Sequence, residues 1–283
     1  MPDFTAADVA ALRKATGAGM MDCKKALDET GGDLEAAKDW LRSQGLAGAS
    51  KRAGRAAQQG AVEIVVEDGG AVGGLAEVTC ETDFVAKSTD FTAFVATLAR
   101  QVAEQGDEGI EGQPFDESTV GDAIKQVGAK VGENVGLGRA YRFESPDGIV
   151  DGYKHIQNDR GTIGVLVELG GVDRASASAQ TVAHDVALHV ASAAPRWVRR
   201  EDVPSDIVDK ERKVLEELTR NEGKPEQAVP KIIEGRLNAF FKDQVLLEQP
   251  FIREPKTTVG KLVADLGGDA AIRRFVRVKI GEE

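Results

Sequence analysis

Cysteine and histidine are scarce in this sequence, and their positions exclude several kinds of chemistry. The chain has 283 residues but only two cysteines, Cys23 and Cys80, which do not make a disulfide framework. Of its three histidines, His155 stands alone, and His184 and His189 are spaced to lie roughly 140° apart around a predicted helix. The sequence also has no glycine-rich phosphate loop, nucleophile elbow or zinc signature. We therefore expect no metal site, no cofactor and no enzymatic bond chemistry.

Long apolar runs, an export signal and an excess of basic charge are also missing. No apolar run reaches the roughly 18 residues of a membrane-spanning helix. The first ten residues, MPDFTAADVA, lack the basic start and apolar stretch of a signal peptide, so we expect a cytoplasmic protein without membrane contact. The formal net charge is −11, from 36 basic and 47 acidic residues. Because nonspecific nucleic-acid binding needs a broad basic surface, no direct nucleic-acid contact is expected.

Residues 1–45 have the pattern of three short helices. TAAD at 5–8 resembles a capping box, TGAG at 16–19 breaks the chain, and Asp33 can cap a third helix. The apolar face of that third helix is formed by Leu34, Ala37, Trp40 and Leu41. We expect a compact bundle that resembles ubiquitin-associated (UBA) domains.

A basic segment rich in glycine and alanine follows, and we interpret residues 46–59 as a linker. It has no apolar stripe that would fix a helix against a core. Its basic side chains are expected to be solvated, with RNA binding as the alternative; they are Lys51, Arg52 and Arg55.

The middle of the chain predicts an α+β core with antiparallel sheets, built from two similar halves. AVEIVVE and VGGLAEVTC flank DGG, a hairpin signal, and helices are predicted at about 91–105 and 117–131. One or two strands should follow between 135 and 157. NDRGTIGVLVELGG and a helix then repeat the order of turn, strand and helix. The predicted subdomains are residues 60–142, and residues 143–203 together with 247–283.

Residues 204–246 predict a helical hairpin inserted in the second subdomain. Two narrow apolar stripes with charged residues on the other faces are separated by the turn NEGKPEQ, which is typical of a short antiparallel coiled coil. After it, TVGKLVADLGG predicts a last helix, and IRRFVRVKIGEE predicts a strand that rejoins the second sheet.

The stretch CETDFVAKST is unusual because it places a carboxylate and a large ring side by side at the end of a strand. In one interpretation, Phe84 packs on the following helix near Phe91 and Asp83 caps a turn. In the other, both side chains are presented to a partner. The residue pattern alone favours the first.

Two longer segments resemble the signature segments of the bacterial elongation factor Ts family. They are LRKATGAGMMDCKKAL at 12–27 and EVTCETDFVAK at 77–87. Further stretches come in the order of that family, among them VGENVGLGR, IGVLVEL, LHVAS, GKPEQ and QPF. Thr79 departs from the pattern, which has asparagine there. The resemblance implies a guanine-nucleotide exchange factor for elongation factor Tu, which it binds with GDP, without nucleotide or with GTP.

The resemblance also implies which residues contact that partner. Asp83 and Phe84 are expected to insert between two helices of its nucleotide domain and distort the nucleotide and magnesium site. The remaining expected contacts are Arg13, Thr16, Gly17, Gly19, Met20, Met21, Thr82, Val85, Val131, Gly132, Asn134, His189 and Phe251. For His189 and for both methionines, burial in a helical core is the alternative; it is strongest for Met20, which like His189 lies on an apolar helix face.

Two other functions are consistent with parts of the sequence. A general adaptor would bind its partner through the three-helix bundle alone. A thiol enzyme would use Cys23 or Cys80, and the cations Lys24 and Lys25 beside Cys23 can lower a thiol pKa. No histidine base lies in the first 150 residues, which argues against the enzyme.

Overall fold

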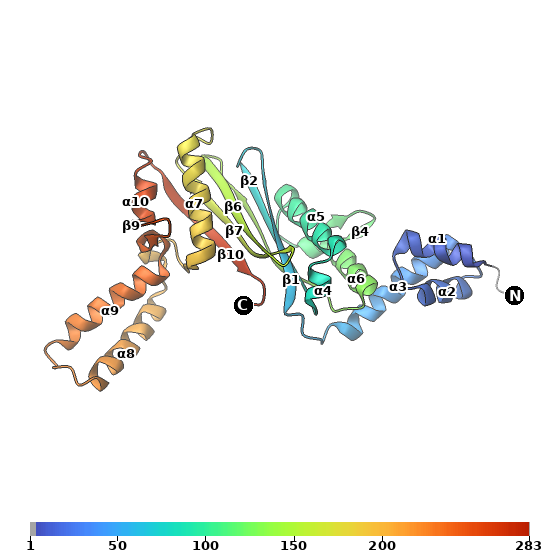
Figure 1. Cartoon of the computed structure of the whole chain (residues 1–283), viewed down its shortest axis with the longest axis horizontal. Coiled ribbons are helices and arrows are strands. Elements are labelled where there is room, and N and C mark those ends of the chain that lie inside the picture. The colour runs from blue at the N-terminus through green and yellow to red at the C-terminus, as the bar shows by residue number, and fades with distance from the viewer. Residues whose placement is uncertain (1–3, 283) are drawn as a thin grey trace.

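The protein is elongated, with a helical bundle at one end, two sheets in the middle and a pair of helices at the other end (Figure 1). The computed structural model describes residues 4–282. Helices and antiparallel sheets are both present, which confirms the α+β class. Within the described part of the chain, no helix has the length and hydropathy needed to cross a membrane.

The N-terminal bundle consists of α1 (Ala6–Thr16), α2 (Met20–Glu29) and α3 (Leu34–Arg52). The predicted capping box starts α1, since Asp8 N donates to Thr5 Oγ1 and Thr5 N donates to Asp8 Oδ2. The carboxylate of Asp33 accepts from the first amides of α3, as predicted. The buried side chains of the bundle are Leu12, Cys23, Ala26, Leu27 and Ala37.

The predicted linker is wrong over its first half, because α3 continues to Arg52. Only residues 53–58 connect this helix to the first strand. A β-carbon on Gly45 would lie 3.1 Å from that of Ala129 in α6 (Val120–Val131), so the glycine permits close helix packing instead of ending the helix. Alanine, leucine and lysine have high helix propensity, and α3 packs on α6 where Gly45 meets Ala129.

The two central sheets share one topology. The first has the order β1-β2-β5, from Gln59–Glu67, Val72–Cys80 and Gly136–Glu144. The second has the order β10-β7-β6, from Ala271–Lys279, Arg160–Gly170 and Gly148–Gln157. In each sheet a hairpin is followed by a long helix, and a later strand pairs with the second strand of the hairpin. This topology agrees with the repeated pattern in the sequence, and β10 joins the second sheet as predicted.

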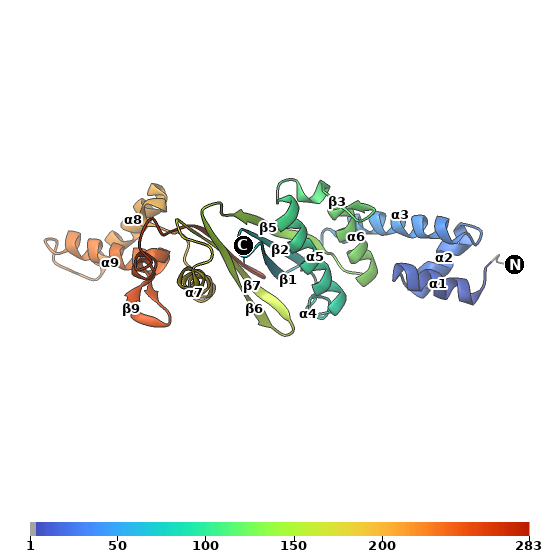
Figure 2. The same ribbon diagram turned by 90° about the horizontal axis from the view of Figure 1, so that it is seen from above.

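The core has four layers, because the two sheets pack face to face and each carries a helix on its outer face (Figures 1 and 2). Alternation along β7 sends Val165, Val167 and Leu169 towards α7 (Ala177–Ala193), whereas Leu166 points to the other sheet. On the opposite side, α5 (Thr89–Gln105) covers the first sheet with Phe91 and other apolar side chains.

Shorter elements connect these layers. Those beside the first sheet are α4 (Asp83–Ala86), a 3₁₀ turn at Ile110–Gly112, β3 (Pro114–Phe115) and β4 (Ser118–Thr119). Those beside the second are 3₁₀ turns at Arg200–Asp202 and Leu246–Glu248, β8 (Pro250–Phe251), β9 (Glu254–Thr258) and α10 (Val259–Ala264).

The helical hairpin is formed by α8 (Ser205–Asn221) and α9 (Val229–Gln244), which lie side by side (Figure 1). Its buried side chains are Val203, Leu215, Val229, Ile233, Leu237, Phe241 and Val245. The hairpin projects from the end of the molecule opposite the bundle (Figure 1). Coiled-coil packing of the two helices remains a prediction.

Candidate partner-binding site

Two helix caps determine how Asp83 and Phe84 are displayed. Thr82 is the N-cap of α4, and its hydroxyl accepts from Val85 N. Ser88, six residues later, is the N-cap of α5. The chain therefore makes a single helical turn between β2 and α5, with Val85 packed against the core and Phe84 directed outward.

The Phe84 side chain is 74% exposed, whereas Phe91 is 1% exposed. The interpretation in which Phe84 packs on the helix near Phe91 is therefore wrong. Lys87 Nζ lies 3.4 Å from the Asp83 carboxylate and 4.4 Å from the centre of the Phe84 ring. One side chain thus contacts both residues of the exposed turn.

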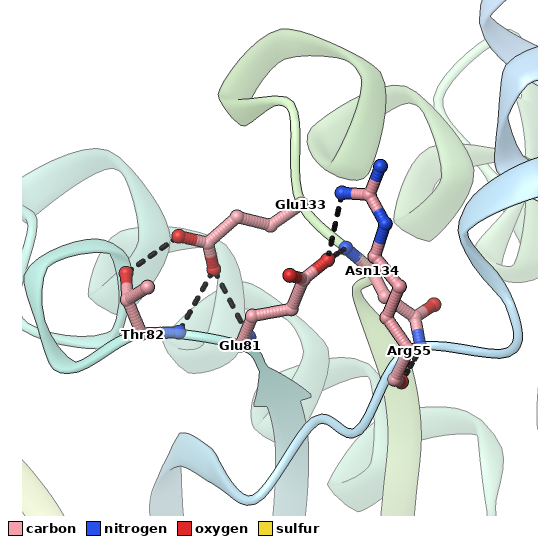
Figure 3. A network of polar contacts seen from close by, with 5 residues as sticks. All are labelled: Arg55, Glu81, Thr82, Glu133 and Asn134. Carbon is pink, nitrogen blue, oxygen red and sulfur yellow. Dashed lines mark hydrogen bonds and ion pairs between the residues drawn. The ribbon is translucent and has the colours of Figure 1, made fainter.

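A carboxylate from a distant segment holds the base of this turn (Figure 3). Glu133, between α6 and β5, accepts from the backbone N–H groups of Glu81 and Thr82, each at 3.0 Å. Its second oxygen accepts from the Thr82 hydroxyl at 2.5 Å. Thr82 was expected to contact the partner, but here its side chain is bound within the protein.

Asn134 is also bound within the protein. Its backbone N–H donates to the Glu81 carboxylate at 2.6 Å, and its side-chain amide donates to the Arg55 carbonyl at 2.7 Å. Arg55 in turn donates to Glu81 at 3.3 Å (Figure 3). Of the neighbouring residues expected at the site, Val131 is half-buried, and Gly132 is exposed with φ +76° at the end of α6.

A second exposed apolar group lies on the bundle, at the start of α2. Met20 is 58% exposed and Met21 is 72% exposed, so the core alternative for Met20 is wrong. Arg13 and Gly19 are also exposed, while Thr16 is half-buried and donates to the Leu12 carbonyl. Exposed methionines suit an adaptable contact with another protein.

Lys130 connects the bundle to the start of α5. Its side chain runs beside Gly17 in the α1–α2 turn, where an added β-carbon would lie 2.7 Å from the lysine Cε. Its ammonium donates to the Asp90 carboxylate at 2.7 Å and lowers the pKa of that carboxyl. One lysine from α6 therefore joins the α1–α2 turn, inside the first segment that resembles a family signature, to Asp90, which lies just after the second.

His189 and Phe251 lie in the core, not on a contact surface. They are 1% and 5% exposed, so their expected direct contacts with a partner are not possible in this conformation. Ile252 N donates to His189 Nδ1 at 3.2 Å, and the opposite nitrogen donates to the Gln249 side-chain oxygen at 2.9 Å. Burial lowers the pKa of His189, which keeps the imidazole neutral.

Neither cysteine has the environment of a reactive thiol. Cys23 and Cys80 are both fully buried. Burial and the nearby Glu133 carboxylate raise the pKa of Cys80 to about 12, so almost no thiolate forms near neutral pH. These surroundings argue against a thiol enzyme.

Several residues of this site were missed by the sequence analysis. Glu133 lies inside VGENVGLGR, between residues that were selected, and its spacing to Glu81 gives no sign of contact. Lys87 carried a detectable signal, since a lysine four residues after Asp83 is a favourable helical pair. No sequence pattern indicated the role of Lys130.

The comparisons with known proteins cover nearly the whole chain. The family model described as Elongation factor TS matches residues 81–282. An elongation factor Ts from Micrococcus luteus is 46% identical over 99% of this chain and 100% of its own length. The elongation factor Ts from Streptomyces avermitilis is 45% identical over 99% of this chain and 100% of its own length. The one from Symbiobacterium thermophilum is 42% identical over 100% of this chain and 93% of its own length.

Proposed function

The chain belongs to the elongation factor Ts family of translation factors, and we propose that it binds elongation factor Tu and promotes the release of GDP. Release of GDP then lets GTP bind. The activity needs no bond chemistry, because exchange requires only that the factor bind the nucleotide-free partner more tightly than the nucleotide-bound one.

The observation that carries this proposal is the exposed ring of Phe84 on an ordered turn. A phenylalanine that is 74% exposed leaves apolar surface in water. Burying such a side chain between helices of a partner contributes about 1.5–3 kcal/mol. The turn is capped at Thr82 and closed by Ser88, so little conformational freedom is lost when it inserts.

The energy needed for exchange exceeds what one ring provides. Accelerating release by about 10,000-fold requires roughly 5.5 kcal/mol of differential binding. Met20 and Met21 offer a second apolar surface on the bundle, and its burial adds to the total. We therefore assign binding to both surfaces and distortion of the nucleotide site to the turn.

Asp83 adds an electrostatic effect to the insertion of Phe84. Its carboxylate is on the same exposed turn and is paired with Lys87. Beside a nucleotide site it accepts hydrogen bonds from the partner or repels anionic groups that hold magnesium. Either interaction favours the distorted, nucleotide-free state.

The test is the release of a fluorescent GDP from purified elongation factor Tu, with and without this protein. We expect acceleration that falls more than tenfold in Phe84→Ala. Val214→Ala is the matched control, because Val214 is also exposed and apolar but lies on α8 at the far end of the molecule. Circular dichroism of each variant checks that the fold is retained.

Other results would contradict parts of the proposal. Release that is fast in both wild type and Phe84→Ala would remove the turn from the mechanism and leave the bundle. No acceleration by the folded wild-type chain would refute the exchange function. If residues 1–56 alone kept full affinity for the partner, the adaptor function would be favoured instead.

A further inference from the structure

We propose that Glu133 is a positioning residue for exchange, which fixes the turn carrying Asp83 and Phe84 before a partner binds. This inference rests on the proposed function. Glu133 itself is half-buried and lies at the base of the turn, whereas Phe84 is at its exposed end. Its effect on exchange is therefore transmitted through the position of Phe84.

The hydrogen bonds of Glu133 satisfy groups that the turn leaves without partners. β2 ends at Cys80, and the helical bonds of α4 begin only after Thr82, so the N–H groups of Glu81 and Thr82 have no partner in either element. Both donate to one oxygen of Glu133. Bonds to an ionised carboxylate are stronger than neutral ones, and here they hold two successive residues.

The third bond of Glu133 orders the cap. The Thr82 hydroxyl donates to Glu133 and accepts from Val85 N, so its rotamer is determined from both sides. That hydroxyl is the N-cap of the turn that carries Phe84. Loss of the carboxylate frees the threonine rotamer and with it the start of α4.

The contact is reciprocal, which makes it rigid. Glu133 accepts from the backbone of Glu81, and the Glu81 carboxylate accepts from the backbone of Asn134, the residue after Glu133 (Figure 3). One glutamate of each segment therefore accepts hydrogen bonds from the main chain of the other segment, which prevents sliding as well as rotation. Arg55 and the Asn134 side chain attach the segment after α3 to the same group.

A double-mutant cycle on stimulated GDP release tests this role. When this protein is present at a lower concentration than elongation factor Tu, we expect Glu133→Ala to reduce the rate of GDP release about tenfold. Glu133→Gln should stay within about threefold, because its amide oxygen accepts both N–H groups and its NH₂ donates to the Thr82 hydroxyl. In a Phe84→Ala background, Glu133→Ala should change the rate less than about twofold, since the positioned group is gone.

A measurement on the isolated protein separates this inference from the proposed function. Hydrogen exchange of the Glu81 and Thr82 amides should accelerate at least about tenfold in Glu133→Ala, and the amide of the buried Val78 within β2 should stay protected. Two results would overturn the positioning role alone. One is wild-type protection of the Glu81 and Thr82 amides in Glu133→Ala. The other is a double variant in which Glu133→Ala and Phe84→Ala lower the rate of GDP release independently. A wild-type chain that does not accelerate release would overturn both proposals.

Discussion

The ammonium of Lys87 lies 4.4 Å from the centre of the Phe84 ring, and the same group pairs with Asp83. The lysine is one helical turn after Asp83, so a single side chain restricts both exposed residues of the turn. Before a partner arrives, the ring therefore has a preferred orientation on the surface. This arrangement reduces the ordering cost of binding without hiding the ring.

Lys87→Met should lower stimulated GDP release about fivefold. A cation–π contact and an ion pair at an exposed site together contribute about 1 kcal/mol, which corresponds to that factor. Lys87→Arg keeps both interactions and should stay within about twofold of wild type. Lys125→Met, which removes an exposed ion pair elsewhere on the surface, is the control and should have no effect. Equal rates in Lys87→Met and wild type would show that the orientation of the ring does not limit exchange.

Gly17→Ala should weaken both the stability of the bundle and the affinity for the partner. Gly17 has φ +69°, where an L-residue costs about 1–2 kcal/mol, and the new methyl group would also displace Lys130. Gly31→Ala is a matched control because Gly31 has φ +63° with nothing within 4 Å of its added β-carbon. The melting temperature should fall in both variants. The affinity for the partner, measured by titration, should fall only in Gly17→Ala. A similar loss of affinity in Gly31→Ala would show that reduced stability of the bundle, and not displacement of Lys130, weakens binding.

Acidification should loosen the β8–β9 hairpin through His189. Burial lowers the pKa of this imidazole in the folded state, so the unfolded chain binds the proton more readily. The neutral imidazole therefore favours the folded state fully above the unfolded pKa of about 6.5. This contribution to stability is lost as the pH falls from there through the lowered pKa of the folded state. A proton on Nδ1 also removes the acceptor for Ile252 N–H.

The measurement is the melting temperature and the Ile252 amide exchange of wild type between pH 7.5 and 4.5. His189→Gln should make both quantities depend less on pH than they do in wild type. His155→Gln, at an exposed position, should leave their pH dependence unchanged. An Ile252 amide whose protection does not change on acidification in wild type would contradict this account.

Local patterns were sufficient for most of the architecture. The DGG turn, the strand within NDRGTIGVLVELGG and the cap at Asp33 each predicted an element that the structure contains. The end of α3 was mispredicted because the glycine- and alanine-rich segment after Gly45 has no apolar stripe and was interpreted as a linker. A glycine at a close helix contact and a glycine at a helix end look the same in sequence, and only the neighbouring Ala129 distinguishes them.

The site was harder to predict because burial depends on which neighbours cover a face. Met20 shares a helical face with Cys23, but it is the first residue of α2 and is left exposed. His189 has a similar apolar face and is covered by the segment around Gln249 and Phe251. Glu133 and Thr82 are 51 positions apart, and no local pattern predicts that contact.

The continuity of α3 has a consequence for which partners can be bound. The helix has 19 residues, so it is about 28 Å long, and it leads from the bundle with Met21 to the packing contact with α6. The separation and relative direction of Met21 and Phe84 are therefore built into the chain. Inserting one residue in the middle of α3 would rotate the bundle by about 100° and carry Met21 to another side. Under the proposed function, a partner that receives both groups at once must have two recesses at the matching distance.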